Sequence, residues 1–133
     1  MKPIKEEIRV RWRETDSAGI VHFTNFFVYF EIAEQKLLRD VLKLDLTRAS
    51  QSKRFSLPRV EAYCQYSSPA KFDDLLEVEL NIAAVGKSSI TYAFSVFNKT
   101  TGRVSANGRV KVVAVDEGFR AVEIPSDILE LLK

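Results

Sequence analysis

The strongest constraint on the fold is a change of hydrophobic period near residue 25. Before it, apolar residues alternate with charged ones, as in a half-buried strand, and after it they recur at helical spacing. The helical stripe consists of Phe26, Tyr29, Phe30, Ala33, Leu37, Leu38 and Val41. Its width predicts a helix that Thr24 or Asn25 caps, that ends near Leu44, and that is buried along most of its length.

The rest of the chain has the period of strands. Ile8, Val10 and Trp12 predict a first strand, and a polar stretch over residues 47–55 predicts a loop. Four further strands are expected over residues 60–66, 76–82, 90–96 and 104–112, arranged as a meander. Residues 124–133 predict a short helix with Pro125 near its start. One apolar helix on one curved antiparallel sheet is a two-layer α+β fold.

Length and composition narrow the class of protein. A chain of 133 residues with 46% hydrophobic residues fits one domain over 1–133. A formal net charge of +2 gives no reason to expect nucleic acid or a membrane surface as a partner. The first residues show no apolar signal segment, so we expect a cytoplasmic protein. With one His and one Cys, no dedicated His/Cys metal site is expected, and Cys64 fits a core position.

A lone acid, Asp16, stands in the stretch RETDSAGIVHFTN, which covers residues 13–25. Asp, Ser and Gly are common in turns for backbone reasons, and on pattern alone a plain turn is the favoured interpretation. However, the turn leads into an apolar helix, whose first N–H groups lack intrahelical partners and can stabilise an oxyanion. A carboxylate beside such donors suits acyl transfer from an activated ester.

These residues also carry a family resemblance. The segments ETDSAGIVHFTNFFVYFEIAEQKLL, SPAKFDDLLEVEL and VGKSS resemble the hotdog-fold acyl-CoA thioesterases, in particular the group typified by 4-hydroxybenzoyl-CoA thioesterase and the short-chain acyl-CoA thioesterases of bacteria. The resemblance implies a five-stranded antiparallel sheet wrapped around one long central helix, with a short C-terminal helix. It also implies hydrolysis of a small aromatic or short-chain acyl-CoA, with no cofactor beyond the CoA of the substrate.

The resemblance assigns roles to individual residues. Asp16 matches the catalytic acid, as nucleophile or general base, and the backbone N–H of Phe23 matches the group that polarises the thioester carbonyl. Active sites in this family lie at a dimer interface, so a homodimer or homotetramer is expected. Many short-chain members have Tyr-His where this chain has His22 and Phe23, so His22 is a pocket wall, a donor or a replacement for an aromatic residue.

Several further residues are candidates for substrate binding. Gly19 and Asn25 belong to the matched motif, although Asn25 is most simply a helix cap. The turn formed by Lys87, Ser88 and Ser89 matches one that in the family runs near the CoA phosphates or pantetheine. An ordinary hairpin turn explains these three residues equally well.

Two other functions are compatible with the sequence. A hotdog hydratase or dehydratase would need a His base, for which His22 is the only candidate. A non-catalytic acyl-CoA-binding module would keep its function when Asp16 is replaced. The acid in the matched motif favours the thioesterase.

Overall fold

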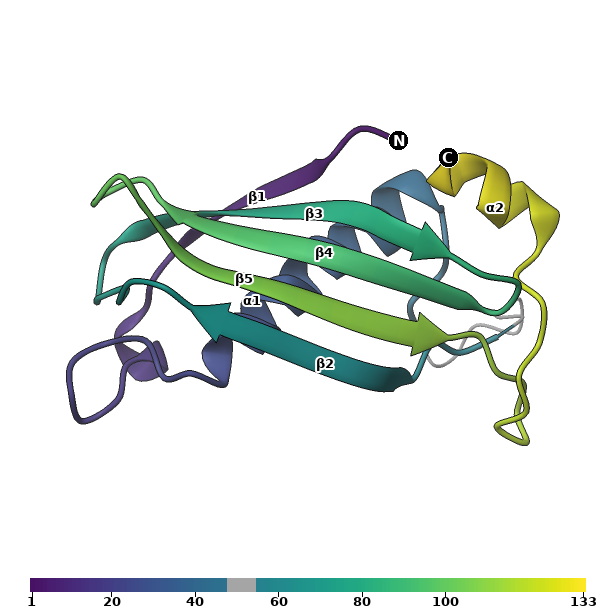
Figure 1. The fold of residues 1–133 in the computed structure, drawn as a ribbon, viewed down its shortest axis with the longest axis horizontal. Coiled ribbons are helices and arrows are strands. Elements are labelled where there is room, and N and C mark those ends of the chain that lie inside the picture. Colours follow the sequence, from purple (N-terminus) through teal and green to yellow (C-terminus); the bar gives the residue numbers. More distant parts are fainter. Residues whose placement is uncertain (48–54) are drawn as a thin grey trace.

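The protein is a curved antiparallel sheet laid over one long helix (Figure 1). The computed structural model describes residues 1–47 and 55–133. The sheet order is β1-β3-β4-β5-β2, and α1 lies along the concave face. This arrangement confirms the α+β fold with a short C-terminal helix. The elements are β1 (Ile4–Arg9), α1 (Asn25–Lys36), β2 (Arg59–Tyr66), β3 (Leu75–Val85), β4 (Ser89–Asn98), β5 (Arg103–Val113) and α2 (Ser126–Leu132).

The sheet topology corrects one expectation. The last three strands form a meander, but β2 pairs with β5 instead of β3. The reason is that β1 occupies the free edge of β3 over six residue pairs, from Ile4 opposite Leu80 to Arg9 opposite Leu75. The remaining edge belongs to β5, and β2 therefore becomes an outer strand of the sheet.

The first strand and the long helix also differ in extent from the sequence prediction. β1 ends at Arg9, and Trp12 lies in a 3-10 turn with 79% of its surface exposed, so its predicted place in a half-buried strand is wrong. The α-helix ends at Lys36 and continues as a π-helical turn over Leu37–Val41. Lys43 then takes a left-handed conformation with φ of 55°, which ends the helical path close to the predicted Leu44.

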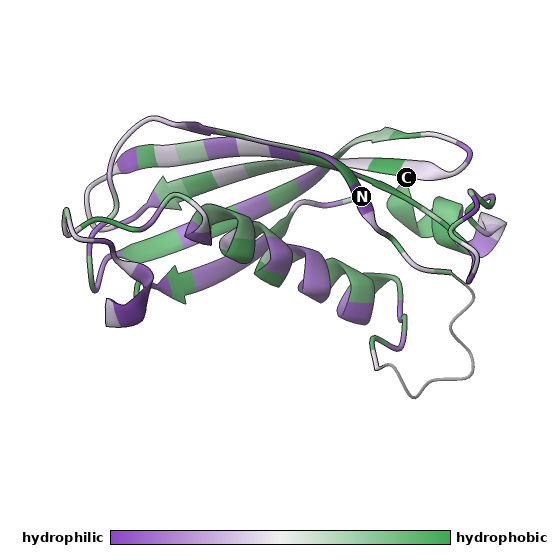
Figure 2. Ribbon diagram, turned by 90° about the horizontal axis from the view of Figure 1, so that it is seen from below, coloured by the Kyte–Doolittle hydropathy of each residue, from purple (hydrophilic) through white to green (hydrophobic). Residues whose placement is uncertain are grey.

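The core lies between α1 and the concave face of the sheet (Figure 2). Phe30 stacks on Phe94 of β4, with ring centroids 4.4 Å apart. Gly108 makes room for this contact, since a Cβ atom there would lie 2.3 Å from the Phe30 ring. A glycine on β5 therefore allows the helix to approach the sheet closely.

One face of the molecule remains uncovered in the single chain. All residues of β2 are exposed except the half-buried Cys64. The adjacent helix exposes Val28 and Ile32, so α1 is buried along one face only, in contrast to the predicted burial. The predicted loop over residues 47–55 falls largely outside the described residues.

Three tyrosines have a raised pKa, so we expect the folded protein to lose stability at alkaline pH. Burial raises the pKa of Tyr29 and Tyr92 well above the ordinary value of 10, and the carboxylates of Glu14 and Glu34 add to it. Burial, with the neighbouring Cys64, raises the pKa of Tyr66 to about 12. The unfolded chain therefore loses these protons at lower pH than the folded one. The contribution of these tyrosines to the stability of the folded protein is complete below about pH 10 and is lost as the pH rises above it.

Thermal unfolding measured between pH 7 and 12 tests whether ionisation of these tyrosines destabilises the folded protein. The unfolding temperature of the wild type should begin to fall above about pH 10, near the ordinary pKa of tyrosine. Tyr92→Phe should show a shallower fall because it removes one of the two fully buried phenols. An identical pH dependence in the two proteins would show that Tyr92 does not contribute.

Candidate active site

The loop that carries Asp16 is fixed by backbone pairing on both sides. The Asp16 N–H donates to the Ile20 carbonyl at 2.8 Å, and the Gly19 N–H donates to the Asp16 carbonyl at 3.0 Å. Gly19 adopts a φ of 81°, a conformation that favours glycine. The Val21 N–H donates to the Ala70 carbonyl, which attaches the loop to the segment between β2 and β3.

The Asp16 carboxylate supports the turn with one oxygen and leaves the other oxygen unbonded within the described residues. Its Oδ1 atom accepts the N–H of Ala18 at 2.8 Å and of Ile20 at 3.4 Å. Its Oδ2 atom has no hydrogen-bond partner within residues 1–47 and 55–133. One oxygen thus orients the side chain and the other is available to a substrate or a water molecule.

The turn into α1 presents a free backbone donor. The Phe23 N–H donates to no acceptor among the described residues, and the Phe23 side chain is 59% exposed. Thr24 takes the predicted N-cap position, but its side chain makes no capping hydrogen bond. The Asn25 amide instead donates to the Glu14 carbonyl at 2.8 Å. A free N–H at the positive end of a helix is suited to bind a developing oxyanion.

Asp16 and Phe23 meet at one groove of about 430 Å³ between the start of α1 and the end of β2. The groove combines one carboxylate with aromatic and aliphatic walls and two serines. Its lining residues are Asp16, Ile20, Val21, Phe23, Phe26, Tyr66, Ser67, Ser68, Pro69 and Ala70. Tyr66 also donates its hydroxyl to the Phe23 carbonyl at 2.9 Å, which fixes the residue that carries the free N–H.

The sequence prediction missed the role of Glu14, a buried acid just before Asp16. Its Oε1 accepts the Arg11 N–H at 2.8 Å and the Tyr29 hydroxyl at 3.1 Å, while its Oε2 binds the Arg11 guanidinium at 3.1 Å. Its carbonyl accepts the N–H of His22 at 2.9 Å and the Asn25 amide. Glu14 therefore connects the Asp16 loop, the His22 turn and the helix. The spacing of Glu14 and Tyr29 alone gave no signal of this contact.

His22 and Gly19, which were predicted to bind substrate, lie outside the groove. The His22 Nδ1 atom lies 2.7 Å from the Thr24 hydroxyl, and its ring lies tilted against that of Phe23, with the ring centroids 4.8 Å apart. Neither His22 nor Gly19 lines the groove. Their predicted contact with substrate stays a prediction.

The turn predicted to contact CoA lies at the opposite end of the sheet from the start of α1 (Figure 1). Lys87 and Ser88 belong to this turn, between β3 and β4. Their carbonyls accept the N–H groups of Ile124 and Ala114, and the Ser89 carbonyl accepts that of Gly86. One chain thus does not bring these residues to the Asp16 groove, and a shared site would need a second copy.

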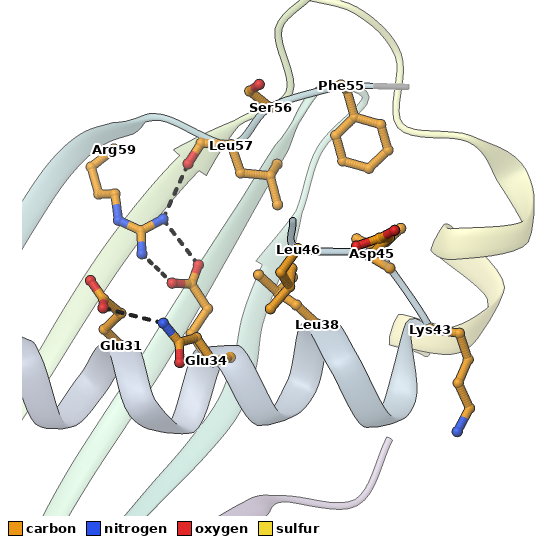
Figure 3. Close-up of a pocket in the computed structure, with 12 residues that line it drawn as sticks. Glu31, Glu34, Leu38, Lys43, Asp45, Leu46, Phe55, Ser56, Leu57 and Arg59 are labelled. Carbon is orange, nitrogen blue, oxygen red and sulfur yellow. Dashed lines mark hydrogen bonds and ion pairs between the residues drawn. The ribbon is translucent and has the colours of Figure 1, made fainter. Parts of the chain in front are cut away.

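A second cavity, of about 580 Å³, lies near the other end of α1 (Figure 3). Its wall includes Leu38, Leu46 and Leu57 together with an ion pair between Glu34 and Arg59. Glu34 pairs with Arg59, and Glu31 accepts the Gln35 amide at 3.3 Å. Both acids lie inside α1, away from the free N–H of Phe23 in the turn before it. The cavity is larger than the Asp16 groove but lacks its chemistry.

Residues 1–47 and 55–133 contain neither a candidate metal site nor a membrane-spanning helix. They contain no group of three or more His, Cys, Asp and Glu side chains arranged to hold a metal ion. No helix within the described ranges is long and apolar enough to cross a membrane.

Comparison with known proteins identifies the family. The thioesterase-like superfamily matches residues 10–132, which is nearly the whole chain. The chain belongs to the thioesterase-like superfamily. A protein of Aquifex aeolicus is 35% identical over 125 residues, 94% of each chain. The 4-hydroxybenzoyl-CoA thioesterase of Pseudomonas sp. is 27% identical over 140 residues, covering 98% of this chain and 97% of the relative.

Solved members of the thioesterase-like superfamily share the fold. The crystal structure of a 1,4-dihydroxy-2-naphthoyl-CoA thioesterase from Synechocystis superposes with a TM-score of 0.88 at 21% identity, covering 98% of this chain and 96% of that one. This likeness confirms the predicted hotdog fold, and the match over residues 10–132 confirms the predicted family.

Proposed function

We propose that this thioesterase-like protein hydrolyses acyl-CoA, giving a carboxylic acid and free CoA, at the groove between Asp16 and Phe23. The observation that carries the proposal is that, within the described residues, one groove is lined both by Asp16, whose carboxylate keeps one free oxygen, and by Phe23, whose backbone N–H is unpaired in the turn before α1. These are the two groups that acyl transfer from a thioester requires, a base or nucleophile and an oxyanion donor.

The reaction needs only groups that the chain supplies together with water. The thioester carbonyl oxygen accepts the Phe23 N–H, and negative charge develops on it in the tetrahedral intermediate. Acting as general base, Asp16 takes a proton from the attacking water, and that proton then goes to the departing CoA thiolate. Acting as nucleophile, Asp16 would form a mixed anhydride that water hydrolyses, with the same products.

The groove walls favour a small aromatic or short-chain acyl group. Phe26, 3% exposed, packs edge-on against Tyr66 with ring centroids 5.4 Å apart, and both line the groove. Flat rings of this kind offer an acyl ring large contact areas. The names of relatives agree, because 4-hydroxybenzoyl-CoA is an aromatic thioester.

We propose further that two copies pair through β2 to complete the site. β2 is an outer strand whose main-chain groups are open to a second strand, and it exposes Val60, Tyr63 and Tyr66. A two-fold axis would make the partner's β2 antiparallel, so the opposite ends of the two sheets would meet. Such a pair would also shield the Asp16 groove from water. Cytoplasmic location and the absence of a cofactor stay predictions.

The hydratase alternative has less support. It requires a histidine base at the substrate, and His22 lies outside the groove with its Nδ1 atom occupied by Thr24. Addition of water to an enoyl-CoA without thiol release, lost on His22→Ala, would establish it instead.

Release of free thiol from a panel of CoA esters tests the proposed function. The panel contains benzoyl, 4-hydroxybenzoyl, phenylacetyl, short straight-chain and long-chain esters. We expect turnover of one aromatic or short-chain class and little activity on long chains. Binding of the esters with no thiol release from any of them would identify a binding module and contradict the proposal.

A further inference from the structure

Asn25 holds the donor peptide between His22 and Phe23 directly, through the His22 carbonyl, and indirectly, through the Glu14 carbonyl. The backbone N–H of Asn25 donates to the His22 carbonyl at 2.9 Å, and the Asn25 side-chain amide donates to the Glu14 carbonyl at 2.8 Å. That Glu14 carbonyl also accepts the His22 N–H at 2.9 Å. Asn25 is thus hydrogen-bonded to the His22 carbonyl of the donor peptide and to the Glu14 carbonyl, which also holds the His22 N–H.

Because the peptide is planar, the hydrogen bond between the Asn25 N–H and the His22 carbonyl also sets the direction of the Phe23 N–H. The His22 carbonyl and the Phe23 N–H belong to one trans peptide and point in opposite directions. Because the carbonyl is drawn toward Asn25 at the helix start, the Phe23 N–H is directed away from the helix. Any rotation of the Asn25 backbone would rotate the donor with it.

The anchor itself is rigid. The Glu14 side chain is 6% exposed and is bonded to the Arg11 main chain, the Arg11 guanidinium and the Tyr29 hydroxyl. Tyr29 lies one helical turn after Asn25 on the same helix and is fully buried. A hydrogen bond to Glu14 therefore fixes Asn25 to the protein core.

We propose, on the basis of the proposed thioesterase function, that Asn25 is a positioning residue of the reaction. Its side-chain amide holds the Phe23 N–H in the direction that meets the thioester oxygen in the transition state. The side chain itself does not touch the substrate, because Asn25 does not line the groove. This role differs from the helix cap predicted from the sequence, because the Asn25 side chain bonds the Glu14 carbonyl instead of a helix N–H.

Steady-state kinetics of Asn25→Ala test the proposal. Displacing a catalytic group by about 1 Å costs on the order of 100-fold in rate, so kcat should fall by about 10- to 100-fold. KM should stay within about 3-fold of the wild type, since a donor engaged mainly in the transition state affects kcat and kcat/KM alike. Gln35→Ala is the matched control, because it also removes one side-chain amide donor from α1, at the far end from Asp16. Its kcat should equal that of the wild type.

A second measurement separates positioning from activity and from folding. The amide resonance of Phe23 in ¹⁵N-labelled protein should shift and broaden in Asn25→Ala and stay in place in Gln35→Ala. An unchanged resonance together with an unchanged kcat, whatever the change in unfolding temperature, would overturn the proposal. If the wild type hydrolyses no ester, the thioesterase function fails, and an unmoved resonance would show separately that Asn25 does not hold the donor.

Discussion

Replacing Asp16 by asparagine is expected to lower kcat for thioester hydrolysis by about 10²- to 10⁴-fold, the range that loss of a general base causes. The amide has the size of the carboxylate but neither its charge nor its basicity. Its oxygen can still accept the N–H groups of Ala18 and Ile20, so the turn and the fold should persist. Thiol release under saturating ester, measured beside the circular dichroism spectrum, gives the result.

Ser17→Ala is the matched control for the Asp16 variant. Ser17 is exposed in the same turn and does not line the groove, so its kcat should stay near that of the wild type. Equal activity of Asp16→Asn and the wild type would remove Asp16 from the mechanism. Loss of activity in both variants would point to the turn itself instead of the carboxylate.

Removing the Arg59 charge should have the largest effect on stability, a loss of about 2–4 kcal/mol in the free energy of unfolding for Arg59→Leu. The Glu34 side chain is 3% exposed and pairs with Arg59, which joins β2 to α1 (Figure 3). Without Arg59, a buried carboxylate would lose its partner, and breaking such a pair typically costs about 3–5 kcal/mol. The lower figure reflects the 41% exposure of the Arg59 side chain, since water screens the pair on that side.

A double-mutant cycle in urea isolates this interaction. The double variant with leucine at positions 34 and 59 should recover much of the lost stability, since it leaves no unpaired charge. Lys99→Ala, which opens the exposed pair between Lys99 and Glu7, should cost far less. If Arg59→Leu is no more destabilised than Lys99→Ala, the pair does not anchor β2.

Local patterns predicted most of the fold. The period-two segments became β2 to β5, and the helical stripe became α1. In β3, β4 and α1 the pattern reports which face is buried, whereas β2 is exposed on both faces in the single chain. The first strand was predicted too long, since Trp12 continues the alternation after the chain has left the sheet, whereas Val10 is buried and its N–H still donates to the Asp74 carbonyl. The cause is the Glu14 carboxylate, which accepts the Arg11 N–H and closes a turn there.

The candidate site was predictable where it depends on neighbouring residues and not where it depends on distant ones. Asp16, Gly19 and the helix start lie within one stretch, whose turn chemistry is visible in the sequence. Asn25 was assigned as a cap because its true partner, the Glu14 carbonyl, is eleven residues away. Lys87 was expected near the substrate, but the topology of a single chain carries its turn to the other end of the sheet.

The most direct test of the account is a crystal structure of Asp16→Asn bound to an acyl-CoA ester that the wild type hydrolyses. We predict the ester in the groove lined by Phe26 and Tyr66, with its carbonyl oxygen about 2.7–3.1 Å from the Phe23 nitrogen, the distance of an oxyanion-hole contact. The thioester carbon should face residue 16. An ester bound in the cavity beside Glu34 and Arg59, with the Asp16 groove empty, would contradict the account.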